Sequence, residues 1–362
     1  HRTSPLVLPL GISFFTFQQI AFLVDIRQGA IQRGPLSLYG VFVSFFPQLI
    51  AGPIVHYREL APQLAFLQRP SSSAVRCGLL LLTLGLAKKL MIADNLAPYV
   101  DRIFSTPADS IVAGDTLMAG WYYGLQLYFD FSGYADMAIG LALLFGIKLP
   151  ENFASPYQAS NIQAFWRRWH ITLSHFLRDY LYVPLGGSKH GLSRHLFALF
   201  TTMLLGGLWH GAGWQFLLWG GMHGVLLAVM VLWRQLNLFR MPKTAGWFMT
   251  FCAVMLAWVP FRATSLEHTW SLYSGLAVWQ WGALGELVNN LSQGAISLSS
   301  PGLLVLVATL IVLVMPNSMA WAKQLNQPRH YFWQGAVVGG VMLVVMKAML
   351  DLPSQAFLYF NF

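Results

Sequence analysis

Long stretches without a charged residue dominate the pattern of apolar and polar positions along the chain. They include Leu6–Val24, Gly34–Tyr57, Leu196–Trp233, Thr244–Phe261, His268–Gly285 and Leu287–Ala322. A helix needs about 20 mostly apolar residues to cross a bilayer, and several of these stretches are that long. The pattern therefore predicts an all-α, polytopic membrane protein, with about eight to ten membrane segments by the same criterion.

Proline and glycine interrupt three of these segments. The prolines in Phe45–Val55 predict a bent or re-entrant segment, because proline removes a helical hydrogen bond. Ser132-Gly133 offers a place for a break within Thr116–Ile147, and His210–Gly213 separates two half-helices. Non-helical backbone is tolerated at membrane depth only where protein covers it or water reaches it. We therefore expect several broken helices.

Two further segments combine apolar and charged residues. Cys77–Leu96 is predicted to be a span that ends around Lys88-Lys89. Asn161–Tyr182 mixes arginines with aromatic rings, which is typical of an amphipathic helix at the level of the lipid headgroups. Pro184–Gly187 is predicted to end that helix.

Composition and charge narrow the class of protein further. Charged residues make up 10% of the chain and apolar residues 56%, whereas soluble domains carry about 25% charged residues. The net charge of +9 is spread over single and paired basic residues at the ends of apolar runs, which favours lipid headgroups over nucleic acid as a partner. The chain starts at His1 on an apolar run, so we expect N-terminal spans to precede it.

His210 is the first candidate for chemistry. It lies in a run from Leu196 to Trp233 that contains no charged residue, and an ionisable group at membrane depth is by default a functional candidate. The alternative is a structural role, in which the packed histidine makes hydrogen bonds between two helices. Neighbouring glycines leave space for a substrate beside the imidazole. The imidazole could then act as a general base and acid, or accept an acyl group itself.

His170 is the second candidate. On a continuous helix, Trp166, Arg167 and Ser174 would share its face. Arg167 could hold a phosphate or carboxylate, or stabilise an oxyanion. The alternative is that Arg167 and Arg168 only anchor the helix at the interface.

The histidines could instead bind a metal ion, and the two aspartates of the apolar run could have a chemical or a structural role. His170, His210 and His223 could supply three ligands, but their spacing matches no zinc signature, and we expect no metal. Asp130 and Asp136 are expected to face a polar interior, where pairing with an arginine or capping a helix break is at least as plausible as a chemical role.

Several ordered motifs resemble the membrane-bound O-acyltransferases, and in particular the bacterial branch that O-acetylates exopolysaccharides such as alginate. They are PLGISFFTF (Pro9–Phe17), SFFPQLIAGP (Ser44–Pro53), YFDFSGYADMAIG (Tyr128–Gly140), FWRRWHITLS (Phe165–Ser174), RDYLYVPLGG (Arg178–Gly187), LLGGLWHGAG (Leu204–Gly213) and the closing Phe357–Phe360. The resemblance covers nearly the whole chain and is closest from Tyr122 to Trp219.

The resemblance implies one integral-membrane acyltransferase domain over residues 1–362, built as a bundle of tilted helices around a central tunnel, with 122–219 as its catalytic core. His210 stands where the family has its catalytic histidine, and His170 where its second signature histidine lies. The residues expected to bind substrate or support the histidines are Arg167, Trp166, Trp169, Ser174, Trp209, Asp130, Asp136 and Tyr134.

The expected function is the transfer of an acetyl group, with acetyl-CoA as the cytoplasmic donor, for O-acetylation of an alginate- or cellulose-like exopolysaccharide. The resemblance places the chain in the bacterial inner membrane, with a periplasmic acetyltransferase or polysaccharide-synthase partner and without a bound cofactor. Two other hypotheses stay open. One is a transporter or flippase that uses the buried His and Asp as proton relays. The other is a scaffold that docks a soluble enzyme.

Overall fold

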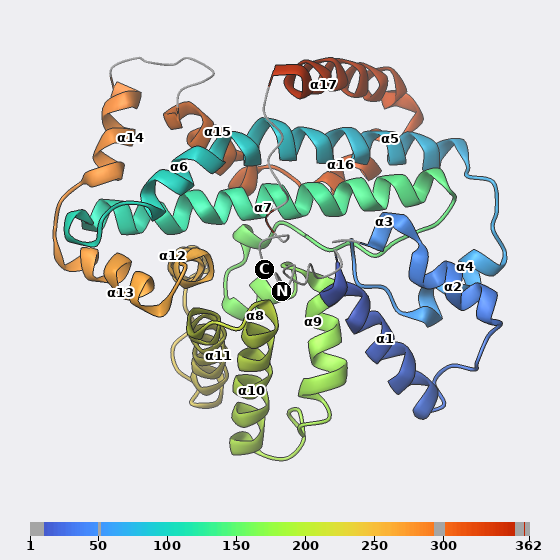
Figure 1. The fold of residues 1–362 in the computed structure, drawn as a ribbon, viewed down its shortest axis with the longest axis horizontal. Helices are drawn as coiled ribbons and strands as arrows, with labels where there is room; N and C mark the ends of the chain where they lie inside the picture. The colour runs from blue at the N-terminus through green and yellow to red at the C-terminus, as the bar shows by residue number, and fades with distance from the viewer. Residues whose placement is uncertain (1–10, 50–51, 293–300, 352–357, 359–362) are drawn as a thin grey trace, which may run out of the picture.

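The computed structural model of the protein describes residues 11–49, 52–292, 301–351 and 358, and these residues form helices and connections without a β-strand (Figure 1). The helices are α1 (Ile12–Arg27), α2 (Leu36–Ser44), α3 (Phe46–Leu49), α4 (Tyr57–Ala65), α5 (Ser72–Ala87), α6 (Asp94–Phe104), α7 (Ala113–Leu144), α8 (Ile162–Trp166), α9 (Ile171–Leu177), α10 (Leu192–His210), α11 (Trp214–Gln235), α12 (Lys243–Arg262), α13 (Leu266–Ser274), α14 (Gly282–Ser292), α15 (Pro301–Val314), α16 (Ser318–Leu325) and α17 (Tyr331–Asp351).

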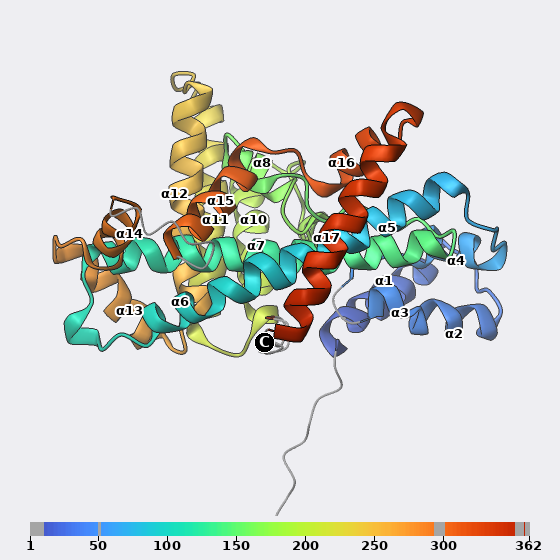
Figure 2. The ribbon, with the colours of Figure 1, turned by 90° about the horizontal axis from the view of Figure 1, so that it is seen from above.

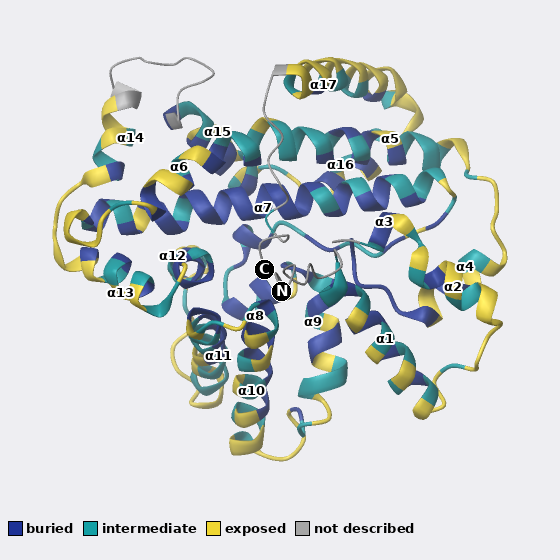
Figure 3. Cartoon of the chain, in the orientation of Figure 1, coloured by how far each residue is buried: buried dark blue, intermediate teal, exposed yellow. Residues whose placement is uncertain are grey.

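Helix α7 is the central element. Its 32 residues would span roughly 48 Å at 1.5 Å per residue. In Figure 1 it crosses the middle of the molecule, with α5 along one side and α8 to α12 on the other. Figure 3 shows it buried along most of its length. A helix that is apolar on all sides is expected in the interior, and α7 has packed neighbours on several faces.

The contact between α5 and α7 depends on two pairs of glycines. A Cβ atom on Gly85 would lie 2.5 Å from the carbonyl oxygen of Gly133, and one on Gly78 would lie 2.8 Å from that of Gly140. Small residues let two membrane helices approach until their backbones touch. The prediction that α7 breaks at Ser132-Gly133 is wrong, because Gly133 serves this close approach inside a continuous helix.

Helix α5 also continues further than the sequence predicted. A π-helical turn, Lys88–Ala93, joins α5 to α6, so the helical path runs on to Phe104. The prediction that this segment ends around Lys88-Lys89 is wrong. Both lysines face aspartates of α7, and this pairing allows two cations to lie inside the helical assembly.

The predicted all-α membrane fold is confirmed, but fewer helices are continuous spans than expected. Within the described residues, α11, α12 and residues 328–350 are long and apolar enough to cross a membrane, and the pair α15 and α16, bent by 68°, would add a fourth span. Several other predicted segments are short or interrupted. Figure 2 shows α12 standing across the direction of α7, while α17 crosses α5 on the outside.

The bend predicted in Phe45–Val55 is confirmed. Phe45 separates α2 from α3, and residues 52–56 are buried without being helical. The main-chain N–H of Ile54 donates to the Thr172 hydroxyl at 3.0 Å. Buried backbone outside a helix therefore finds a partner in the protein, as the membrane environment requires.

Gly85→Val should disrupt the contact between α5 and α7, because the added side chain meets the backbone of Gly133. Overpacking of this kind costs about 1–3 kcal/mol or more, so we expect a clearly lower unfolding midpoint in detergent. Gly339→Val on α17 is the matched control, because a Cβ atom there meets nothing within 4 Å. Equal midpoints for the two variants would contradict the close glycine contact.

Candidate active site

His210 lies at the end of α10, where the predicted break occurs. Gly211 is extended, with φ 171° and ψ 156°, and α11 begins at Trp214. The two helices pack closely, since a Cβ atom on Gly207 would lie 2.3 Å from the carbonyl oxygen of Phe216. This arrangement holds the imidazole of His210 inside the protein, with 5% of the residue exposed.

Aromatic rings surround the imidazole of His210. Trp209 lies 4.6 Å away between ring centroids, Phe261 4.9 Å and Trp219 5.1 Å. The contact with Trp219 is edge-to-face, with an interplanar angle of 88°. Trp209 thus lies beside the histidine, as predicted, whereas Trp219 and Phe261 come from helices that the sequence did not link to it.

His170 does not lie in a helix. Helix α8 ends at Trp166, and His170 precedes α9 with a left-handed backbone, φ 42° and ψ 56°. The prediction that Trp166, Arg167 and Ser174 share one helical face with His170 is therefore wrong, because the chain turns between the two helices. Arg167 is exposed. Ser174 donates its N–H to the carbonyl of His170 at 2.9 Å, and its hydroxyl to the carbonyl of Trp169 at 3.3 Å.

Asn152 holds the turn at His170 in place. Its side-chain oxygen lies 3.2 Å from Nδ1 of His170 and accepts hydrogen bonds from the N–H and the hydroxyl of Thr172, at 3.2 and 2.9 Å. The main-chain carbonyl of Asn152 accepts a hydrogen bond from the N–H of Ile171 at 3.0 Å. With the asparagine oxygen as acceptor, Nδ1 of His170 carries the proton. Asn152 thus orients the imidazole of a residue whose backbone conformation is uncommon.

The two histidines share a small buried cavity of about 10 Å³, which is room for about one water molecule. Its lining comes from α7 to α12: Leu127, Trp166, Trp169, His170, Leu173, His210, Trp219, Trp258 and Phe261. Four predicted residues, the two histidines with Trp166 and Trp169, are thereby brought together. Sequence reasoning missed Asn152, Trp219 and Trp258, because no periodicity runs through the turn before His170 or the break after His210, and only the fold shows which side chains face the two histidines.

The two predicted aspartates do not line this cavity. Asp136 pairs with Lys88 at 2.6 Å, and Asp130 with Lys89 at 2.7 Å, while Lys89 also reaches Asp94 at 2.8 Å. Asp130 further accepts the N–H of Leu358 at 2.9 Å. Pairing within the protein is therefore their observed role, with lysine in place of the expected arginine. Tyr134 is half-buried against the core and does not line the cavity either.

His223 lies behind the cavity and is fully buried. Its ring is 4.9 Å from that of Trp219 and 5.1 Å from that of Trp166. The indole of Trp219 contacts both His210 and His223. Within the described residues, no three His, Cys, Asp or Glu side chains gather as a metal site.

A second polar cluster was not expected from the sequence. The Tyr180 hydroxyl donates to Asp25 at 2.6 Å and lies 3.2 Å from Nδ1 of His56. Asp25 and His56 are both buried. The rings of Phe17 and Phe176 stack at 4.2 Å between this cluster and Trp209. The cluster thus ties α1 and the bent segment to the turn after α9.

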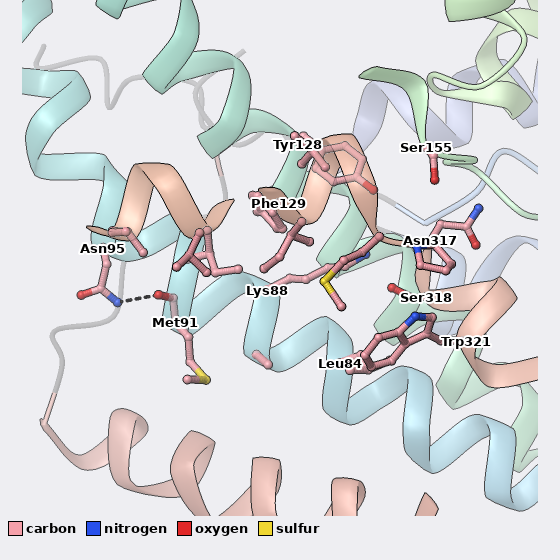
Figure 4. A pocket seen from close by; sticks show the side chains of 18 of the residues that line it. Leu84, Lys88, Met91, Asn95, Tyr128, Phe129, Ser155, Asn317, Ser318 and Trp321 are labelled. Atoms are coloured by element: carbon pink, nitrogen blue, oxygen red, sulfur yellow. Dashed lines mark hydrogen bonds between the residues drawn. The ribbon is translucent and has the colours of Figure 1, made fainter. Parts of the chain in front are cut away.

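A larger cavity of about 660 Å³ lies away from the histidines (Figure 4). Its walls are mostly apolar and come from α5 to α7 and from α15 to α17. Lys88 and Tyr128 line it together with Asn317 and Ser318. Neither His170 nor His210 reaches it.

Fold and site together define a helical membrane protein with two buried histidines on one small cavity. The model of the membrane-bound O-acyltransferase family, MBOAT, matches residues 27–273, which include both histidines. The chain belongs to this family, as its motifs predicted.

Three relatives show the range of the family. The chain is 40% identical over 404 residues to the peptidoglycan O-acetyltransferase of Helicobacter pylori, covering 100% of the chain and 76% of that protein. It is 42% identical over 275 residues to the "Probable alginate O-acetylase AlgI" of Azotobacter vinelandii, covering 75% and 54%. It is 31% identical over 240 residues to the teichoic acid D-alanyltransferase of Bacillus subtilis, covering 63% and 60%.

The chain spans about half the length of the alginate O-acetylase that it matches and about three quarters of the peptidoglycan O-acetyltransferase. Family and relatives confirm the prediction of an enzyme of the O-acetyltransferase class.

Lys88→Met should destabilise the protein by about 3–5 kcal/mol, because it leaves Asp136 charged in a largely buried position. The double variant Lys88→Met/Asp136→Leu should recover most of that loss. Arg102→Met is the control, since Arg102 and Glu286 form an exposed pair whose removal costs at most about 1 kcal/mol. Unfolding free energies measured in mixed micelles test this, and a double variant no more stable than Lys88→Met would contradict it.

Asn152→Ala should cost about 1–3 kcal/mol of unfolding free energy, because buried donors of His170 and Thr172 lose their acceptor. The thermal midpoint in detergent measures this cost. Gln235→Ala, at an exposed amide, should leave the midpoint unchanged. If both variants unfolded alike, Asn152 would not hold the turn at His170.

Proposed function

We propose that the chain transfers an acetyl group from a cytoplasmic thioester donor, acetyl-CoA, for the O-acetylation of an extracytoplasmic polysaccharide. The observation that carries this proposal is the pair of buried histidines on one cavity in a member of an O-acyltransferase family. Acetyl-CoA enters as a substrate. The relatives bear the names of peptidoglycan and alginate O-acetylation enzymes, which supports a glycan as the final acceptor.

The chemistry assigned to His210 is general base and acid catalysis. The neutral imidazole takes the proton of an acceptor hydroxyl as the hydroxyl oxygen attacks the thioester carbon. The carbon–sulfur bond then breaks, and the imidazolium returns the proton to the departing sulfur, so that a thioester and an alcohol become an ester and a thiol. His170, oriented by Asn152, faces the same cavity and positions the reacting groups. General base catalysis contributes about 10²–10⁴ in rate.

The setting assigned to this reaction is the bacterial inner membrane. A transferase in this position receives its donor on one side and serves an acceptor on the other. A periplasmic acetyltransferase or a polysaccharide-synthase complex is the partner that passes the acetyl group on to an alginate- or cellulose-like chain.

Transfer of label from radiolabelled acetyl-CoA in proteoliposomes tests the proposal. His210→Ala should lower covalent transfer to a partner or sugar acceptor by roughly 100- to 10,000-fold, while the protein still elutes as a folded species. His190→Ala, at an exposed loop residue, should transfer at the wild-type rate.

Two results would contradict the proposal in different ways. Unchanged transfer by His210→Ala would remove that residue from the chemistry. Labelled donor that appears intact in the lumen, with no covalent product from the wild type, would indicate a transporter in place of an acyltransferase.

A further inference from the structure

Three indole N–H groups at the histidine cavity are buried without a close hydrogen-bond acceptor among the described residues. They belong to Trp166, Trp219 and Trp258, whose residues are 9%, 2% and 1% exposed, and all three side chains line the cavity that His170 and His210 share. Trp258 has the hydroxyl of Tyr157 as a partner within reach, so Trp166 and Trp219 are the two donors left for a ligand. Buried polar groups in folded proteins are nearly always paired, and one left without a partner calls for an explanation such as a catalytic role.

Three tryptophans that do not line the cavity follow the usual rule. The indole N–H of Trp247 donates to the carbonyl of Tyr157 at 2.9 Å, that of Trp121 to the Thr309 hydroxyl at 3.1 Å, and that of Trp233 to the carbonyl of Phe239 at 3.1 Å. Trp166 and Trp219 have no such partner and both stand beside the histidines, so their position points to a ligand group that accepts hydrogen bonds.

The two indoles come from separate helices that meet at the cavity. Trp166 ends α8, and Trp219 lies on α11, with ring centroids 5.9 Å apart in an edge-to-face contact. Trp219 also contacts the imidazole of His210 edge-to-face at 5.1 Å. Packing on all sides fixes these rings before a substrate arrives, and fixed donors in a water-poor site stabilise developing charge better than mobile ones.

We propose that the indole N–H groups of Trp166 and Trp219 bind the carbonyl oxygen of the acyl donor and stabilise the oxyanion that forms on it. This inference rests on the proposed function. A thioester carbonyl accepts hydrogen bonds and donates none, so it matches two N–H donors. The cavity has room for about one small group, which matches a single carbonyl oxygen.

The electron balance is simple. When the acceptor oxygen attacks, the π pair of the carbonyl moves onto its oxygen, and the two indoles donate hydrogen bonds to the resulting negative charge. When the carbon–sulfur bond breaks, the pair returns to re-form the carbonyl. The indoles neither gain nor lose a proton, and the proton travels through His210 as above. Arg167, which the sequence suggested for this role, is exposed and does not line the cavity.

Trp166→Phe and Trp219→Phe test the proposal by removing the N–H donor while keeping an aromatic ring. Each should lower kcat for acetyl transfer by roughly 100- to 1,000-fold, the usual cost of one oxyanion donor, with KM changed by less than about threefold because the donor acts mainly on the transition state. Trp247→Phe is the matched control. It removes an indole N–H that has a partner inside the protein, so kcat should stay at the wild-type value.

A second pair of variants separates hydrogen bonding from packing. Benzothienylalanine at position 166 or 219 replaces the indole N–H by sulfur and preserves the ring shape, so it should lower kcat as much as phenylalanine does. If kcat falls with phenylalanine and recovers with benzothienylalanine, the rings only fill space and the proposal is wrong. Wild-type kcat in the phenylalanine variants would overturn it as well.

The same assay distinguishes failure of this inference from failure of the proposed function. Active indole variants beside an inactive His210→Ala would overturn only the role of the indoles. A wild-type protein that forms no acetylated product with its partners present would overturn both proposals together.

Discussion

Charge pairing between α5, α6 and α7 is the constraint on which the rest of the structure depends. Two adjacent lysines and three aspartates lie largely buried within the helical assembly. Each ion would be costly alone, and breaking one pair leaves an uncompensated charge. The lysines sit on a π-helical turn that joins α5 to α6, and the glycine contacts bring α5 and α7 close enough for the pairs to form. Helix α7 is thereby fixed, and its Phe131 packs against the imidazole of His170 at 4.7 Å between ring centroids.

The site lies where helices are interrupted, and other groups of the protein stabilise each interruption. The left-handed turn at His170 is held by Asn152, the bend after α3 by Thr172, and the end of α10 by its close contact with α11. Each break removes helical hydrogen bonds in the buried interior, where water is poorly placed to replace them. Helix ends therefore meet at a common point in the interior, and side chains from separate helices reach one cavity. A pair of continuous helices would present their side chains along their lengths instead.

Aromatic packing gives this cavity its rigidity. Rings from α8, α10, α11 and α12 surround the imidazole of His210. They exclude water and leave few polar groups near the histidines. Those polar groups that remain, the amide of Asn152 and the indole N–H groups, therefore have a larger electrostatic effect than they would have near solvent. The Tyr180 cluster adds a second buried polar contact at a distance, linked to Trp209 by stacked phenylalanine rings.

The sequence by itself determined the class, the helical membrane fold, the position of the break at His210 and the two histidines, because apolar length, glycine and proline act locally. It also identified Trp166 and Trp169, which follow each other in one motif with His170. The tertiary structure decided what lies opposite each residue. The lysine partners of Asp130 and Asp136 and the asparagine that orients His170 come from other parts of the chain, and the break after α10 turns Trp219 of α11 back against His210. The prediction from helical periodicity put Arg167 on the same face as His170, because it took the helix to be continuous. In the structure a turn held by Asn152 separates the two side chains.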